Sequence, residues 1–128
     1  MTDRLRIALA QLNPTVGAIA ANLDLALHTL GEAKARNVDI LLFSELFLTG
    51  YFPEDLLFKR RFVADAMSAA RRLAEATAGA GVSVLLPTVW QDGDDLFNAV
   101  LLCENGDIVA RRYKRELPND DVFYEKRY

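Results

Sequence analysis

The sequence has little of what disulfides, metal clusters and membrane spans require. Its 128 residues include one cysteine, Cys103, and one histidine, His28. A single cysteine excludes a disulfide within the chain and a multi-cysteine metal site, and it fits a reducing compartment. The apolar runs fall far short of the ~20 residues that a membrane helix needs. We therefore expect no metal, no membrane partner and a cytoplasmic location.

The sequence also lacks a strong excess of charge. Its 15 Lys and Arg residues against 18 Asp and Glu residues give a net charge of −3. A mildly acidic chain has no overall field that attracts nucleic acid, so we expect no nucleic-acid partner. Hydrophobic residues make up 52% of the chain, which is too many for a disordered protein.

Strand-like and helix-like segments alternate along the chain, and this pattern is typical of an α/β fold. Apolar residues at helical spacing predict the helices, and alternating or continuous apolar runs predict the strands. Pro87 is expected to end the third strand, because proline cannot donate to a ladder. Asn105-Gly106 is the strongest hairpin signal. The expected helices cover 18–36 and a segment from about residue 60, and the expected strands cover 5–12, 38–43, 82–86, 96–103 and 107–114.

Two charged residues lie where predicted strands end: Glu45 just after one and Lys114 at the end of another. Glu45 comes after the apolar run 38–43, and ligands of open α/β sheets bind beyond the carboxyl ends of strands. A carboxylate there can act as a base, or it can be a loop acid that caps a nearby helix. Lys114 could stabilise an oxyanion or pair with Glu45. Alternatively, it belongs with its neighbouring arginines to a solvated edge strand.

The other candidates favour structural roles. Cys103 ends an apolar strand with no histidine nearby, so we interpret it as a structural thiol. His28 lies away from the apolar stripe of its helix, which predicts a surface position. The aromatic residues are expected in the core rather than around a cofactor. They are Phe43, Phe47, Phe58, Phe62 and Trp90.

Three stretches resemble motifs of the nitrilase, or carbon–nitrogen hydrolase, superfamily. Residues 7–17 (IALAQLNPTVG) resemble its opening, 41–51 (LLFSELFLTGY) its glutamate motif and 113–119 (YKRELPN) its lysine motif. Within the superfamily, residues 51–57 and 122–128 are similar to the glutaminase domains of glutamine-dependent NAD synthetases. The resemblance covers the chain from end to end.

The resemblance implies the N-terminal part of an α-β-β-α sandwich, with residues 1–128 forming a partial glutamine amidotransferase domain. Family members use a Glu-Lys-Cys triad. Glu45 matches the general base, Lys114 the residue that stabilises the oxyanion, and Glu125 a supporting glutamate that positions the lysine. Asp120 and Phe123 match positions that contact substrate, although the family often has Tyr-Gly where this chain has Asp120-Asp121.

The implied substrate is glutamine, and its hydrolysis needs no cofactor. The ammonia would amidate deamido-NAD in a synthetase domain that uses ATP and Mg²⁺ and lies outside this sequence. The family's nucleophilic cysteine follows the lysine motif, whereas Cys103 precedes Lys114. We therefore expect an N-terminal fragment that is inactive alone and that forms a homo-oligomer when complete.

Two alternatives stay open. One is a stand-alone hydrolase of the same superfamily that acts on a nitrile, an ω-amide or a carbamoyl compound. The other is a non-catalytic α/β binding module that retains only the scaffold.

Overall fold

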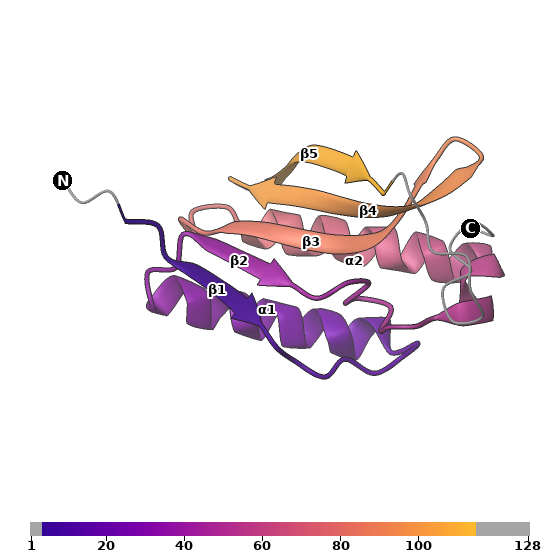
Figure 1. Ribbon diagram of the computed structural model, residues 1–128, viewed down its shortest axis with the longest axis horizontal. Coiled ribbons are helices and arrows are strands. Elements are labelled where there is room, and N and C mark those ends of the chain that lie inside the picture. Colours follow the sequence, from indigo (N-terminus) through magenta and orange to yellow (C-terminus); the bar gives the residue numbers. More distant parts are fainter. Residues whose placement is uncertain (1–3, 115–128) are drawn as a thin grey trace.

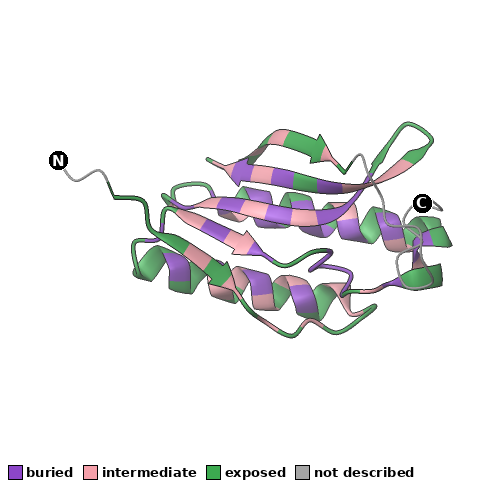
Figure 2. Ribbon diagram, viewed as in Figure 1, coloured by how far each residue is buried: buried purple, intermediate pink, exposed green. Residues whose placement is uncertain are grey.

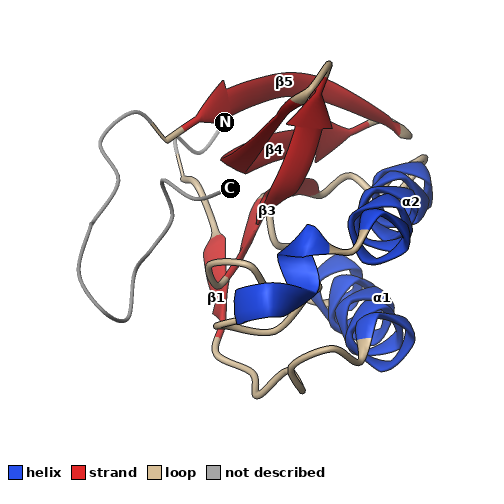
Figure 3. Ribbon diagram, turned by 90° about the vertical axis from the view of Figure 1, so that its right-hand side faces the viewer, coloured by secondary structure: helices blue, strands red, loops and turns tan. Residues whose placement is uncertain are grey.

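The computed structural model describes residues 4–114, in which one sheet carries two long helices on one face (Figures 1 and 3). The expected α/β class is confirmed. The strands are β1 (Ile7–Ala10), β2 (Ile40–Phe43), β3 (Ser83–Asp92), β4 (Asp95–Glu104) and β5 (Asp107–Tyr113). The helices are α1 (Ile19–Ala35), the short 3₁₀ helix η1 (Glu54–Phe58) and α2 (Arg60–Ala76).

The five strands follow one another across the sheet in the order β1-β2-β3-β4-β5. The pairs β1–β2 and β2–β3 are parallel, whereas β3–β4 and β4–β5 are antiparallel. Two reversals restore the original direction, so β5 runs the same way as β2. The carboxyl ends of β2 and β5 therefore lie at the same edge of the sheet, which we call the carboxyl edge.

The core lies between the sheet and the two long helices. Figure 2 shows buried positions recurring along α1 and α2, and most of these residues pack in one cluster with buried strand residues. Alternate side chains of a strand point to opposite faces of the sheet. Those on the face toward the helices, such as Leu41, Leu86 and Leu101, are almost fully buried. The side chains on the second face of the sheet are also apolar but more exposed to solvent: Ile7 is 55% exposed and Leu9 is 61% exposed. Within residues 4–114, no helix or strand covers this second face.

The β3–β4 hairpin corrects the expected end of the third strand. Pro87 does not end β3, which continues to Asp92 and turns at Gly93 with a φ of 63°. The β2–β3 ladder ends at Leu42 opposite Leu85, so only β4 pairs with β3 beyond that point. Proline is tolerated in a strand where one edge has no ladder partner.

The structure confirms the predicted turn between β4 and β5 and most of the predicted aromatic core, with one exception. Asn105 and Gly106 form the β4–β5 turn with positive φ angles of 54° and 87°. Phe43, Phe47 and Trp90 are in the core as expected. Phe58 is not, since it is 55% exposed at the end of η1.

Two further features agree with the sequence. His28 is exposed and pairs with Glu32 one turn along α1. Of the helices within residues 4–114, not one combines the length and the apolar character needed to cross a membrane.

A buried amide ties together the two loops that follow β1 and β2. Asn22 in α1 is only 2% exposed. Its Oδ1 accepts a hydrogen bond from the Thr15 amide at 2.9 Å. Its Nδ2 donates to the carbonyls of Thr15 at 2.8 Å and Leu48 at 3.0 Å. One side chain thus bonds three main-chain groups outside the strands and helices, of which only the Thr15 carbonyl has a second partner, the Ala18 amide at 3.1 Å.

We expect Asn22→Ala to lower the free energy of unfolding by about 2–4 kcal/mol, because the Thr15 amide and the Leu48 carbonyl lose their partner and the Thr15 carbonyl keeps only the Ala18 amide. Thr29→Ala in the same helix is the matched control, since the Thr29 hydroxyl bonds only a carbonyl of its own helix. Its cost should stay within about 0.5 kcal/mol. Urea denaturation measures both, and equal midpoints for Asn22→Ala and the parent would contradict this role.

Cys103 is fully buried in the helix-covered face of β4. Burial in apolar surroundings disfavours the thiolate and raises the pKa of the Cys103 thiol to about 11. The thiol therefore stays neutral at physiological pH, where only a thiolate is a good nucleophile.

We expect iodoacetamide to alkylate Cys103 at pH 8 at least about a hundredfold more slowly in the native protein than in urea, because both thiolate and access are missing. The native rate should rise as pH approaches the raised pKa. Mass spectrometry of the peptide that contains Cys103 measures the rate. Equal rates in native and denatured protein would contradict the burial.

Candidate functional site

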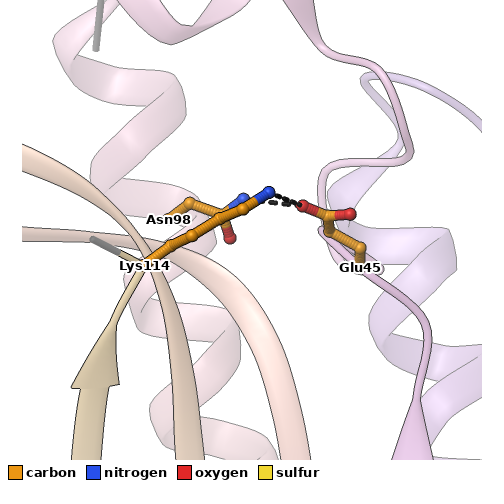
Figure 4. A network of polar contacts seen from close by, with 3 residues as sticks. All are labelled: Glu45, Asn98 and Lys114. Atoms are coloured by element: carbon orange, nitrogen blue, oxygen red, sulfur yellow. Dashed lines mark hydrogen bonds and ion pairs between the residues drawn. The ribbon is translucent and has the colours of Figure 1, made fainter. Parts of the chain in front are cut away.

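Three polar side chains from separate segments meet at the carboxyl edge (Figure 4). Glu45 follows β2, Lys114 follows β5, and Asn98 projects from β4. Lys114 Nζ lies 3.5 Å from Glu45 Oε1. Asn98 Nδ2 donates to the same oxygen at 2.8 Å. The parallel directions of β2 and β5 bring Glu45 and Lys114 together although they are 69 residues apart in sequence.

The loop after Glu45 is anchored in the core. Residues 46–50 are all buried, whereas Glu45 itself is exposed. The Thr49 hydroxyl lies 3.1 Å from the carbonyl oxygens of both Leu46 and Gly50 and shares its one proton between them. A Cβ at Gly50 would lie 2.6 Å from Val16 Cα, and Gly50 has a φ of 78°, so only glycine fits there. A rigid loop therefore presents Glu45 to the edge.

Lys114 is held by its neighbours at the end of β5. The Tyr113 ring stacks on Phe97 with centroids 4.1 Å apart, and its hydroxyl donates to Asp92 at 3.1 Å. Desolvation, followed by the hydrogen bond to the Asp92 carboxylate, raises the pKa of the Tyr113 hydroxyl, so it remains a donor at neutral pH. The Lys114 amide donates to the Asn98 carbonyl at 2.9 Å. These contacts fix the backbone from which the lysine side chain extends.

A pocket of about 400 Å³ opens beside the Glu45–Lys114 pair. Pro87 and Val100 provide apolar walls, and Arg112 adds a second positive charge. The volume falls in the range of pockets that hold small molecules. The pocket lies on the sheet face opposite α1 and α2, because Val100 alternates with the buried Ala99 and Leu101.

The Glu45–Lys114 pair is suited to chemistry rather than to stabilising the fold. The two side chains are 43% and 37% exposed, and ion pairs in such surroundings contribute little to stability. A carboxylate that faces an apolar-walled pocket can move a proton, and an ammonium beside it can stabilise a developing oxyanion. Among the described residues no group of three His, Cys, Asp or Glu side chains could hold a metal ion.

The structure bears on the alternative interpretation of each charged residue. Glu45 caps no helix: α1, η1 and α2 have no side-chain cap hydrogen bond, and the Glu45 contacts go to Asn98 and Lys114. Among the strands of residues 4–114, β5 lies at the edge of the sheet and has exposed arginines, as the alternative proposed, but Lys114 lies beyond it and reaches Glu45. The expected positions Asp120, Phe123 and Glu125 lie outside the described residues.

Sequence reasoning missed Asn98. It is the one polar residue in the segment LFNAVLLC of β4, and the other seven residues are apolar. An isolated amide in such a strand must find a polar partner or face solvent. That pattern is the signal that could have identified it.

Comparison with known proteins agrees with this geometry. The carbon-nitrogen hydrolase family matches residues 6–128. A glutamine-dependent NAD(+) synthetase from Rhodobacter capsulatus is 44% identical over 128 residues, which cover 99% of this chain and 23% of that protein. One from Thermotoga maritima is 42% identical over 125 residues, which cover 98% of this chain and 22% of that protein.

A solved structure gives the same result. The crystal structure of a glutamine-dependent NAD(+) synthetase from Cytophaga hutchinsonii superposes with a TM-score of 0.87 at 32% identity, over 96% of this chain and 21% of that one. The chain thus spans less than a quarter of the length of these relatives. The family match over almost the whole sequence, together with the glutamate and lysine at one edge of the sheet, shows that the chain belongs to the carbon–nitrogen hydrolase family.

Proposed function

We propose that this chain supplies the general base and the oxyanion-stabilising lysine of a glutaminase site in a glutamine-dependent NAD synthetase. The contact between Glu45 and Lys114 beside the pocket carries the proposal. The relatives at 42–44% identity support it, because each is a glutamine-dependent NAD synthetase.

The proposed reaction begins with a thiol that a cysteine outside this sequence provides, since Cys103 is buried in the core. Glu45 takes the thiol proton, and the resulting thiolate attacks the side-chain amide carbon of glutamine. The carbonyl electrons move to oxygen, and the Lys114 ammonium stabilises that oxyanion. As the C–N bond breaks, Glu45 returns the proton to the leaving nitrogen, which departs as ammonia. A thioester remains, and water hydrolyses it to glutamate.

The ammonia would amidate deamido-NAD at a separate synthetase site. ATP and Mg²⁺ belong to that later step, and glutamine hydrolysis itself needs neither. Supporting roles for Glu125, Asp120 and Phe123, assembly into a homo-oligomer and a cytoplasmic location stay predictions from the sequence.

We expect Glu45→Gln in the complete gene product to lower the rate of glutamine hydrolysis at least about a hundredfold, because the amide cannot accept the thiol proton. NAD synthesis from added ammonia should stay at the parental rate, since it bypasses this site. A coupled assay for glutamate and an assay for NAD measure the two activities.

Glu104→Gln is the matched control. Glu104 ends β4, away from the carboxyl edge, and bonds Ser83 rather than Lys114. It should retain glutamine hydrolysis. If Glu45→Gln hydrolyses glutamine as fast as Glu104→Gln, Glu45 is not the base.

A further inference from the structure

We propose that Asn98 is a positioning residue of this site that holds Glu45 in place and selects which of its carboxylate oxygens exchanges the proton. The inference rests on the proposed glutaminase function. It is carried by two contacts of Asn98: its side-chain amide donates to Glu45 (Figure 4), and its main-chain carbonyl accepts from the Lys114 amide.

The two contacts to Glu45 differ in strength. Asn98 Nδ2 is 2.8 Å from Glu45 Oε1, within the optimal range for an N–H···O hydrogen bond. Lys114 Nζ lies 3.5 Å from the same oxygen, beyond that range. Asn98 therefore makes the tighter contact and orients the carboxylate, and Lys114 adds its charge from farther away.

Asn98 and Lys114 both approach Oε1 of Glu45, so the two carboxylate oxygens have different roles. An oxygen that accepts from an amide N–H and faces an ammonium is a poor place for a further proton. Oε2 is left as the oxygen that takes the thiol proton and returns it to the leaving nitrogen. A neutral amide suits this role, because it donates to the carboxylate without a proton of its own to exchange at physiological pH.

The same arrangement lets Lys114 change partners. When an oxyanion forms, the ammonium can shift toward it, and the long contact to Oε1 breaks at little cost. Glu45 keeps its orientation meanwhile, because the Asn98 bond remains. Asn98 also sets where Lys114 starts, since its carbonyl accepts the Lys114 amide at 2.9 Å. One residue of β4 thus aligns the base through its side chain and the lysine through its main chain.

The test compares Asn98→Ala with Asn98→Asp in the complete gene product. Asn98→Ala removes the donor, and kcat for glutamine hydrolysis should fall about tenfold to a hundredfold, as for a lost hydrogen bond to a charged group. KM should stay within about twofold, because the bond is to the base and not to substrate. Asn98→Asp keeps the shape but places a carboxylate against Glu45, so its kcat should fall further than that of Asn98→Ala.

The order of the two variants separates positioning from packing. If Asn98 only filled space, the isosteric aspartate would be better tolerated than alanine, and that order would overturn the inference. Gln91→Ala is the matched control, since its amide donates only to the Gly93 carbonyl at the β3–β4 turn, and it should keep parental kcat. Melting temperatures and ammonia-dependent NAD synthesis confirm that each variant is folded.

The outcomes also distinguish this inference from the proposed function. Parental kcat in both Asn98 variants, beside an inactive Glu45→Gln, would overturn the positioning role and leave the glutaminase site standing. Absence of glutamine hydrolysis in the parent protein would overturn both.

Discussion

The packing of α1 and α2 against one face of the sheet is the constraint on which the rest of the structure depends. It buries the side chains on one face of the central strands β2, β3 and β4, including Leu41 in β2 and Leu101 in β4. Successive side chains of a strand point to opposite faces of the sheet. The residues between the buried ones in β4, Asn98 and Val100, therefore face the pocket on the other side. A shift of β4 by one residue would turn Asn98 into the apolar core and remove its contact with Glu45.

The site combines rigid supports with a loosely held pair. The Asn22 side chain and the close approach of Gly50 to Val16 anchor the loop that carries Glu45. Stacking on Phe97 anchors the end of β5 that carries Lys114. Between these supports the carboxylate and the ammonium are partly exposed and 3.5 Å apart. The backbone that carries each residue is held in place, while the ammonium can separate from the carboxylate. This arrangement suits a reaction in which the lysine must change partners.

Much of this could be predicted from the sequence, because periodicity and turn residues are local signals. They located both helices, the Asn105-Gly106 turn and the loop position of Glu45. The extension of β3 through Pro87 was missed, since it depends on where β2 stops pairing, which is a property of the sheet. The roles of Asn22 and Asn98 were missed for a similar reason: their partners are distant in sequence and only the fold brings them close.

The most direct test of the account follows the amide nitrogen of glutamine. The complete gene product would receive ¹⁵N-amide glutamine, deamido-NAD, ATP and Mg²⁺, and mass spectrometry would compare labelled NAD with the glutamate formed. We expect ¹⁵N in the amide of NAD, accompanied by at least an equal amount of glutamate. Formation of glutamate without any labelled NAD would contradict the account and favour a stand-alone hydrolase. The absence of both glutamate and labelled NAD would contradict it as well and favour a binding module.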